Sequence, residues 1–256
     1  MVQTTHSEAH EHHATLRILS IFDELAQAPD GLTLTELSEL LAVSKSTISP
    51  MLRTMEKKNY LARDLETNRY SIGLKISLIG KAFDRNNLIL NILHDAMVTV
   101  VNITKETCQV GILEGNQVLY IAKVDSPEPI RLFSDVGKTF PVYCTAIGKS
   151  LISTMSEKSI HTLIPEPIKP ITPHTIRSSS TLLKQLEEIR KTGIAWDHEE
   201  VTPGVDCVGV PIKVHGHIAY GMSITTPSYR FTDTKRKLAV DALKKAKLSL
   251  EERLSS

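Results

Sequence analysis

Gly148-Lys149-Ser150 is the first segment of this sequence whose residue types suggest chemistry. It matches the end of a P-loop, in which backbone N–H groups and a lysine hold nucleotide phosphates. The full pattern also needs a glycine five residues before Gly148, and that position is Tyr143. We therefore expect no nucleotide phosphate site here.

Cys207 and the run Asp197-His198-Glu199-Glu200 are two further candidates for chemistry. A thiol becomes a nucleophile beside a base or cation, and the sequence indicates no such base near Cys207. The acidic run offers metal ligands, but neighbouring residues on a strand point to opposite sides. We favour a buried structural or pocket thiol at Cys207, and a solvated acidic loop with Asp197 facing a pocket. No catalytic residue, metal site or cofactor is predicted; a nucleophilic cysteine and a metal site remain as alternatives.

Contact with DNA is the chemistry best supported by the first third of the chain. Hydroxyl side chains can hydrogen-bond to bases or phosphates, and basic side chains can neutralise phosphates. Such residues gather on one predicted helix and on a hairpin after it. The predicted DNA-binding residues are Thr35, Ser44, Lys45, Ser46, Thr47, Ser49, Arg53, Asn68 and Arg69.

The charge distribution supports this location. The whole chain is nearly neutral, with 30 Lys+Arg, 29 Asp+Glu and a net charge of +1. Residues 1–80 carry eight positive and ten negative side chains, a net charge of −2. Between Ser44 and Lys75, however, seven positive and three negative residues give +4. A local basic surface of this kind is typical of a nucleic-acid interface.

Three helices and a hairpin must position these side chains. Apolar residues at helical spacing predict a helix around 18–25. Thr33 and Glu36 have the spacing of a capping box, and Ser44 is placed as the N-cap of a third helix. Two short strands, 60–63 and 69–72, flank a polar turn. This order predicts a winged helix-turn-helix.

The remainder of the chain is predicted to be helical over 74–103, with an interruption at 84–87, and then to form an α+β domain. Its strands pair locally and are separate from its helices, which predicts a largely antiparallel sheet. The predicted strands are 108–113, 118–124, 130–133, 194–197, 207–214 and 218–225, and the predicted helices 146–155, 182–191 and 233–254. The predicted divisions are a disordered tail 1–14, a DNA-binding domain 15–75, linker helices 76–104 and a C-terminal domain 105–256.

Composition places the chain among folded, water-soluble proteins. It has 256 residues, 41% hydrophobic and 23% charged, which disfavours disorder. No apolar run approaches the ~18 residues that span a bilayer, and residues 1–13 lack the apolar region of a secretory signal. The three cysteines are widely spaced and form no C-x-x-C pair, as expected in a reducing compartment. We predict a cytoplasmic protein with no membrane partner.

Blocks in both halves of the chain then resemble a known family. They are Leu34-Thr35-Glu36-Leu37-Ser38, Ser44-Lys45-Ser46-Thr47-Ile48, Leu52-Arg53-Thr54-Met55-Glu56, Arg69-Tyr70-Ser71-Ile72-Gly73-Leu74-Lys75, Pro141-Val142-Tyr143-Cys144-Thr145-Ala146-Ile147-Gly148-Lys149 and Pro203-Gly204-Val205-Asp206-Cys207-Val208. From about Leu16 onward the sequence resembles the IclR family of bacterial transcriptional regulators. The resemblance implies a dimer or tetramer, a winged helix, a linker helix and a C-terminal GAF-like sensor domain.

The resemblance also implies an effector pocket. Carried onto matching positions, its residues are Leu132, Phe140, Ala146, Ile147, Asp197, Val205, Cys207, Ser223 and Thr225. Ala146 and Ile147 begin a predicted helix whose N-terminus attracts a carboxylate, and Ser223 and Thr225 lie on the same side of a strand. A resemblance to sugar-acid catabolism regulators makes a sugar acid or a pyruvate-like compound the expected effector.

Pro50 departs from the family pattern, which has a basic or bulky polar residue there. Proline inside a helix removes a hydrogen bond, so we expect a kink at a cost of ~3 kcal/mol, unless the helix starts later. Recognition then depends more on Ser49 and Arg53.

The predicted function is a homodimeric or homotetrameric regulator of a catabolic operon, which binds double-stranded operator DNA and a small carboxylate effector. The alternatives are a GAF-like enzyme acting on a small acid, with a vestigial DNA-binding module, and a protein-docking adaptor. The sequence does not distinguish an activator from a repressor, and it identifies neither the operator nor the effector.

Overall fold

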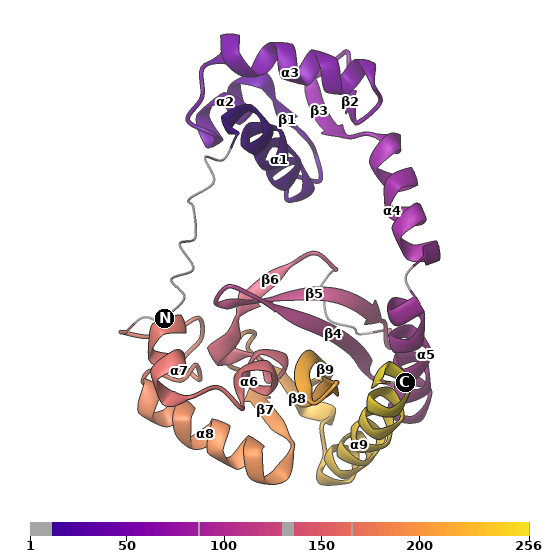
Figure 1. The fold of residues 1–256 in the computed structure, drawn as a ribbon, viewed down its shortest axis with the longest axis vertical. Helices are drawn as coiled ribbons and strands as arrows, with labels where there is room; N and C mark the ends of the chain where they lie inside the picture. The colour runs from indigo at the N-terminus through magenta and orange to yellow at the C-terminus, as the bar shows by residue number, and fades with distance from the viewer. Residues whose placement is uncertain (1–11, 87, 130–135, 165, 256) are drawn as a thin grey trace, which may run out of the picture. The chain divides into compact units, whose positions relative to one another are not determined.

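The computed structural model of the chain describes residues 12–86, 88–129, 136–164 and 166–255. It divides the chain into two compact units, with the boundary between residues 86 and 87 (Figure 1). Most of the predicted tail 1–14 and the predicted strand 130–133 therefore lie outside the described residues.

The first unit is a winged helix-turn-helix, as predicted. Its antiparallel sheet has the strand order β1-β3-β2. A capping box starts α2, because the Thr33 hydroxyl accepts from the Glu36 N–H at 3.2 Å and Glu36 accepts from the Thr33 N–H at 2.7 Å. The elements are α1 (His13–Ala26), β1 (Leu32–Thr33), α2 (Leu34–Leu40), α3 (Lys45–Lys57), β2 (Leu61–Arg63), β3 (Arg69–Ile72) and α4 (Leu74–Asn86).

The third helix, α3, continues through Pro50. It begins at Lys45, directly after the N-cap Ser44, so the alternative of a later start is wrong. Pro50 is exposed, and its carbonyl accepts a hydrogen bond from the Thr54 hydroxyl at 2.8 Å. On the opposite face Ile48 and Leu52 are fully buried against α1 and α2, together with Ile21 and Leu37. This apolar packing holds the helix in place where a backbone donor is missing.

The second unit contains a six-stranded antiparallel sheet in the order β6-β5-β4-β9-β8-β7. Neighbouring pairs such as β4 with β5 and β8 with β9 are joined directly along the chain, as the sequence predicted. The strands are β4 (Thr107–Glu114), β5 (Gln117–Val124), β6 (Thr139–Pro141), β7 (Ala195–His198), β8 (Val205–Val214) and β9 (His217–Pro227).

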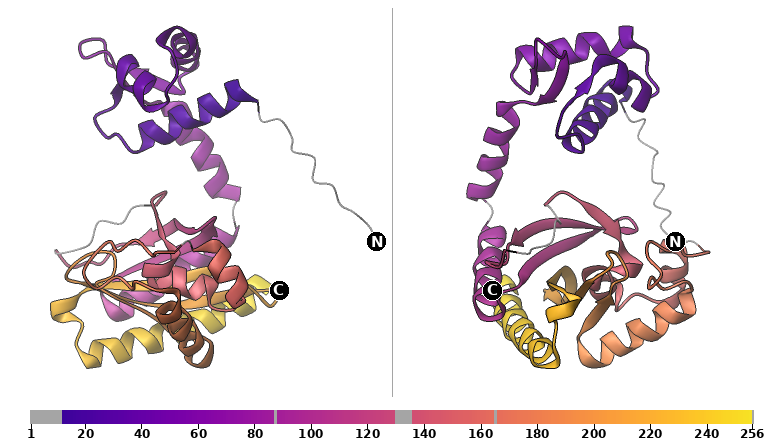
Figure 2. Two further views of the ribbon diagram at one scale, coloured as in Figure 1. Left: turned by 90° about the vertical axis from the view of Figure 1, so that its left-hand side faces the viewer. Right: turned by 180° about the vertical axis from the view of Figure 1, so that it is seen from behind.

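Helices cover both faces of this sheet (Figure 2). On one face α5 and α9 lie side by side over Cys108, Val110 and Ile224. On the other face α6 packs against the sheet, with α7 and α8 beyond it. The helices are α5 (Leu88–Thr104), α6 (Ala146–Ile152), α7 (Glu157–Leu163), α8 (Ser179–Thr192) and α9 (Asp233–Ser255), with 3₁₀ turns η1 (Val142–Cys144) and η2 (Ser228–Arg230).

Two glycines allow α6 to approach the sheet closely. A Cβ at Gly221 would lie 2.8 Å from the Ile147 side chain and 2.9 Å from its carbonyl oxygen. A Cβ at Gly209 would lie 3.1 Å from the Ala146 backbone. The first turn of α6 is therefore fixed directly over β8 and β9.

Two sequence predictions for this unit need correction. The predicted helix 146–155 ends at Ile152 and has only seven residues. The α7 helix lies between the predicted helices 146–155 and 182–191, where no helix was predicted, and Ser156 caps it through a hydrogen bond from the Ser159 N–H. Strand β6 was not predicted either, whereas the other described strands and helices lie where the sequence placed them, with shifts at their ends.

Candidate functional site

The start of α3 presents a cluster of hydroxyl groups to solvent. The Ser44 hydroxyl lies 3.0 Å from that of Ser46 and 2.8 Å from that of Thr47. Ser44 is the N-cap residue, as predicted, but its side chain makes no capping bond to a backbone N–H. The hydroxyl cluster therefore stands at the helix end that a helix-turn-helix presents to base edges, next to the exposed Lys45.

A surface hollow beside α3 brings together four of the predicted DNA-binding residues. It is lined by Thr33, Leu34, Thr35, Ser49, Arg53, Arg63, Asn68 and Tyr70. The Arg53 guanidinium donates to the Ser49 hydroxyl at 3.3 Å, and both residues face out from α3. Their association with the tip of the hairpin makes one polar surface from two segments of the chain.

Arg63 belongs to this surface, and the sequence reasoning did not include it. Its guanidinium donates to the Asn68 side-chain oxygen at 2.6 Å and lies over the Tyr70 ring, 5.5 Å from the ring centre. Arg63 is paired with Tyr70 in the hairpin register. The sequence did contain a signal for Arg63, because it is a basic residue at the end of the first predicted hairpin strand.

Arg69 has a role inside the domain. Its guanidinium donates to the Gly31 carbonyl at 2.6 Å and to both Glu36 carboxylate oxygens, at 3.1 and 3.2 Å. Hydrogen bonds from Thr33, with a smaller effect of the Arg69 charge, lower the pKa of Glu36. The bond network ties β3 to α2, whereas contact between Arg69 and DNA stays a prediction.

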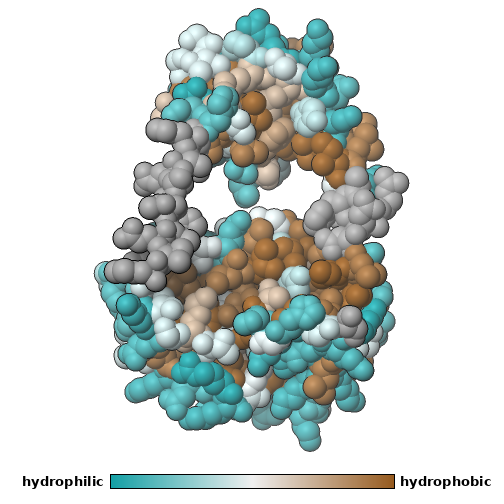
Figure 3. Space-filling model, viewed as in Figure 1, coloured by the Kyte–Doolittle hydropathy of each residue, from teal (hydrophilic) through white to brown (hydrophobic). Residues whose placement is uncertain are grey.

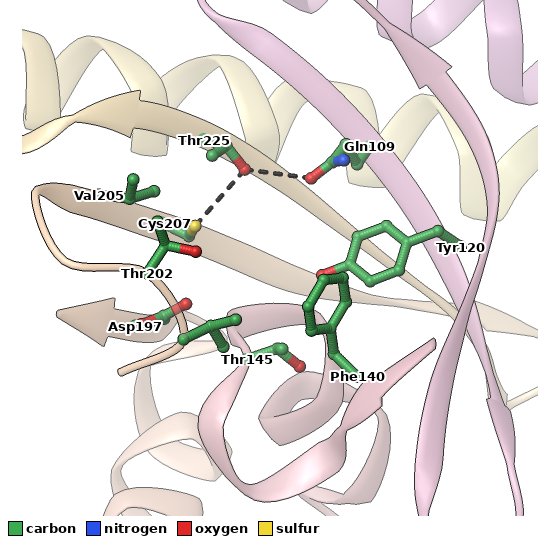
Figure 4. A pocket seen from close by; sticks show the side chains of 10 residues that line it. Gln109, Tyr120, Phe140, Thr145, Asp197, Thr202, Val205, Cys207 and Thr225 are labelled. Carbon is green, nitrogen blue, oxygen red and sulfur yellow. Dashed lines mark hydrogen bonds between the residues drawn. The ribbon is translucent and has the colours of Figure 1, made fainter. Parts of the chain in front are cut away.

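A cavity in the second unit lies between the sheet and the segment that leads into α6 (Figure 4). Its volume is about 90 Å³. The lining combines apolar side chains with hydroxyl, amide, thiol and carboxyl groups. The lining residues are Gln109, Tyr120, Phe140, Thr145, Asp197, Val201, Thr202, Val205, Cys207 and Thr225.

A chain of hydrogen bonds crosses the floor of the cavity. The Cys207 thiol donates to the Thr225 hydroxyl at 3.4 Å, and that hydroxyl donates to the Gln109 side-chain oxygen at 3.2 Å (Figure 4). Burial raises the pKa of the Cys207 thiol well above its usual value, and the neighbouring Asp197 adds to the effect. Cys207 is therefore held as a neutral thiol, which disfavours the nucleophile alternative.

Asp197 is the acidic group of the cavity, and it is only 4% exposed. Its Oδ1 accepts a hydrogen bond from the Glu200 N–H at 2.8 Å. Burial raises the pKa of Asp197 to about 7, against the opposing effect of the Lys149 charge. Asp197 thus changes its charge near neutral pH.

A buried ion pair lies beside this aspartate. The Lys149 ammonium, with no exposed surface, lies 2.5 Å from the Glu200 Oε1 and 3.0 Å from the Gln185 side-chain oxygen. The second Glu200 oxygen, Oε2, is buried without a hydrogen-bond partner among the described residues. The pair joins α6 and α8 to the segment that carries Val201 and Thr202 into the cavity wall.

The pKa of Asp197 predicts how stability depends on pH. A raised pKa gives a stability contribution that is fully present below the ordinary value of 3.8 and is lost as the pH rises through about 7. Asparagine does not ionise and avoids that loss. We expect Asp197→Asn to be more stable than the parent by roughly 1–3 kcal/mol at about pH 8, with no advantage near pH 4. Denaturant unfolding followed by Trp196 fluorescence measures the difference, and a difference that stays constant with pH would contradict the assignment.

The structure brings five of the nine predicted effector residues into the cavity lining: Phe140, Asp197, Val205, Cys207 and Thr225. Ala146, Ile147 and Ser223 are buried where α6 meets the sheet and do not line the cavity. Leu132 lies outside the described residues. The helix-terminus argument for a carboxylate does not hold, because α6 is short and its Gly148 N–H donates to Thr145 Oγ1 at 2.9 Å.

The remaining lining residues were missed by the sequence reasoning: Gln109, Tyr120, Thr145, Val201 and Thr202. For Gln109 a signal was present, since Thr107 and Gln109 alternate with the apolar Cys108 and Val110 on a strand that is buried on both faces. Tyr120 and the segment 201–202 become neighbours of the cavity only through the fold.

A winged helix-turn-helix followed by a separate α+β unit indicates a transcriptional regulator. Residues 14–65 match the model of the IclR helix-turn-helix domain, and residues 81–251 match that of the bacterial transcriptional regulator IclR C-terminal region. The chain belongs to the IclR family of bacterial transcriptional regulators.

Known proteins are similar to this chain along nearly its whole length. The transcriptional regulator KdgR of Dickeya chrysanthemi is 30% identical over 243 residues, 94% of this chain and 79% of that protein. KdgR of Escherichia coli K12 is 31% identical over 224 residues, 87% of this chain and 85% of that protein. The crystal structure of an IclR regulator from Alicyclobacillus acidocaldarius superposes with a TM-score of 0.88 at 25% identity, covering 96% of this chain and all of that one.

The predicted family, fold class and regulatory function are thus confirmed: the chain is a DNA-binding transcriptional regulator with a winged helix-turn-helix and an IclR C-terminal domain. The alternative of an enzyme is disfavoured, because the related proteins are regulators. No described helix is long and apolar enough to cross a membrane.

Proposed function

We propose that the cavity of the second unit binds a small carboxylate, a sugar acid or a pyruvate-like compound, and that its occupancy changes operator binding by the winged helices. The observation that carries this proposal is the cavity itself, which has a buried polar lining. Gln109, Thr145, Asp197 and Thr225 are each at least nine-tenths buried there. Buried polar groups are costly unless they are hydrogen-bonded, so such a lining fits a ligand that carries polar groups.

The hydroxyl and amide groups of this lining suit a carboxylate. Tyr120, Thr145 and Thr202 contribute hydroxyls, and Gln109 contributes an amide. Hydrogen bonds to an ionised acceptor are the stronger kind. Phe140, which packs edge-on against Tyr120 with ring centres 5.7 Å apart, and Val205 supply an apolar wall for the carbon skeleton.

In the DNA-binding unit, we infer that the first turns of α3 and the hollow beside it contact the DNA. The hydroxyls of Ser46, Thr47 and Ser49 reach base edges or phosphates, and Arg53 neutralises phosphate. Arg63 joins this set because it lines the same hollow. The effector acts by population shift, since it can change DNA binding only if it binds one arrangement better than another. A catabolic operon is the proposed target.

We also propose that the protein self-associates as a dimer or a tetramer. Within the first unit, α4 leaves Leu74, Leu78 and Ile79 exposed by 73%, 51% and 48%. Within the second unit, α5 leaves Leu88 and Ile89 exposed, and hydrophobic surface gathers over this region in Figure 3. Apolar side chains grouped in this way on a helix favour burial against another copy. Two winged helices presented together would also bind an operator more tightly than one.

The α4 face yields a prediction about assembly. We expect the double variant Leu74→Lys/Leu78→Lys to shift the protein towards a smaller oligomer, because two buried leucines are worth roughly 1.5–3 kcal/mol each. Sedimentation velocity over a range of concentrations measures this shift. Leu65→Lys, which replaces an exposed leucine of the hairpin turn, is the matched control and should leave the oligomer unchanged. An unaltered oligomer in the double variant would show that α4 is not part of the interface.

Ligand binding is tested by a thermal-shift screen of small carboxylates, because a ligand that binds only the folded protein raises Tm. Pyruvate and gluconate represent the two proposed classes. A carboxylate that raises Tm is then added to a complex of the protein with DNA selected from a random pool, and binding is followed by fluorescence anisotropy. If no carboxylate of the panel raises Tm, the proposed effector class is wrong.

Thr225 provides a sharper test of the cavity. We expect Thr225→Val to weaken carboxylate binding roughly three- to ten-fold, because it removes a hydroxyl bonded to both Cys207 and Gln109. Isothermal titration calorimetry gives the dissociation constant. Thr226→Val is the matched control, since Thr226 is the next residue on β9, points to the other face and has a buried hydroxyl with no hydrogen-bond partner among the described residues. Equal losses in both variants would remove Thr225 from the binding site.

A further inference from the structure

Asp197 meets the cavity from the edge strand β7 (Figure 4). It is 4% exposed, so its carboxyl group is almost wholly removed from bulk water. The ionisable groups that face it come from each of the elements packed around it: Lys149 of α6, Glu200 of the segment after β7, Cys207 of β8, Cys144 of η1 and Tyr120 of β5. Of these, only Lys149 is a cation.

The positive charge of Lys149 is already engaged. Its ammonium group lies 2.5 Å from Glu200 Oε1 and 3.0 Å from the Gln185 oxygen. Lys149 and Glu200 therefore neutralise each other, and an ionised Asp197 would leave this buried cluster with one net negative charge. None of the described residues that line the cavity is lysine, arginine or histidine. A second carboxylate in the cavity would raise the negative charge further.

Two carboxylates that share a buried site cannot both be ionised without a large cost, so one of them holds a proton. Resting on the proposed function, we propose that Asp197 binds the carboxylate effector as a protonated acid, so that each effector enters the cavity together with one proton. The proton comes from solvent and remains on Asp197, whose hydroxyl donates a hydrogen bond to the ligand carboxylate. No covalent bond is formed or broken in the ligand.

In this arrangement Asp197 is a binding residue, and its protonated carboxyl group recognises the acid by donating a hydrogen bond to it. Burial already raises the pKa of Asp197 to about 7 in the free protein. An anion beside it raises that pKa further, so binding draws a proton wherever free Asp197 is ionised. Above neutral pH the dissociation constant should therefore rise about ten-fold for each pH unit.

The test is the number of protons taken up when pyruvate or gluconate binds, using whichever of the two raises the Tm of the full chain. Calorimetric titrations in two buffers of different ionisation enthalpy give this number directly. At about pH 8 we expect uptake of roughly one proton per site, and near pH 5.5 almost none, because Asp197 is then already protonated. Neither ligand titrates in this range, so the proton is bound by the protein.

Variants assign the proton to its residue. Asp197→Asn should abolish the uptake at about pH 8 and, where it binds, should bind with an affinity that no longer falls with rising pH. Asp241→Asn, the same change at an exposed position of α9, should retain the uptake of the parent. If Asp197→Asn does not bind the carboxylate, the inference is tested by the proton uptake of the parent protein and by the pH dependence of its dissociation constant. Asp241→Asn should then retain the proton uptake of the parent.

The outcomes separate this inference from the proposed function. A carboxylate that binds the parent with no proton uptake at about pH 8 overturns the inference and leaves the proposed function standing. Uptake that persists in Asp197→Asn overturns it as well. If neither acid binds at any pH, the proposed effector class itself fails, and the inference fails with it.

Discussion

Replacement of Arg53 by alanine should weaken operator binding roughly 10- to 100-fold, the range expected when a hydrogen bond from a charged group is lost. Arg53 stands on the exposed face of α3, in the hollow that it shares with Ser49, Arg63 and Asn68. Its only described side-chain partner is the Ser49 hydroxyl at 3.3 Å, so little internal bonding opposes its contact with phosphate. Removing one phosphate contact should also lower the slope of log affinity against log salt by about 0.9 for each bound protomer.

Fluorescence anisotropy titrations at several salt concentrations measure both quantities. Arg53→Lys is the matched comparison, because it keeps the charge and loses the forked geometry; it should retain the salt slope and lose part of the affinity. Arg17→Ala, at a half-buried position on α1, should change neither. Unchanged affinity and slope in Arg53→Ala would mean that α3 is not the recognition helix.

Replacement of Lys149 by methionine should destabilise the second unit by about 3–5 kcal/mol, the cost of leaving one charge of a buried pair alone. Lys149 has no exposed surface, and Glu200 is only 3% exposed with one carboxylate oxygen already unpartnered. Without the ammonium group the Glu200 charge would stay buried beside Asp197. The loss should therefore appear in both stability and effector binding.

Trp196, the only tryptophan of the chain, lies on β7 next to Asp197 and reports on the second unit alone. Denaturant unfolding followed by its fluorescence gives the change without interference from the winged helix. The double variant Lys149→Met/Glu200→Gln removes both charges and should regain at least half of the lost stability, whereas Lys191→Met removes a lysine whose pair with Glu187 is exposed and should cost less than 1 kcal/mol. A Lys149→Met variant as stable as the parent would show that the pair does not hold this region.

Local patterns in the sequence predicted most of the fold. The Thr33–Glu36 capping box, the apolar spacing over 18–25, and the turn between β2 and β3 each depend on residues close together in the chain, and each is found in the structure. The α7 helix was missed because a proline-rich segment follows it from Pro165 onward, although Ser156 supplied an N-cap signal. The length of α6 was overestimated because nothing in the local pattern marks its end at Ile152.

The site was harder to predict, because its contacts join distant residues. Lys149 and Glu200 are 51 positions apart, Arg69 and Glu36 are 33 apart, and Thr225 and Gln109 are 116 apart. The sequence pointed to Asp197, Cys207 and Thr225 through family resemblance, and to Arg53 through charge. Their partners are set by which strands become neighbours in the sheet, which no local pattern in a single sequence reveals.

The central claim is that a carboxylate in the buried cavity controls binding of DNA by the winged helices. The most direct measurement is the affinity of the full chain for selected DNA, with and without a saturating carboxylate that is known from calorimetry to bind. We predict a change of about 5- to 150-fold, and DNA should shift the affinity for the carboxylate by the same factor. Thr225→Val should require more carboxylate for the same change. A bound carboxylate that leaves DNA affinity unchanged would contradict the account.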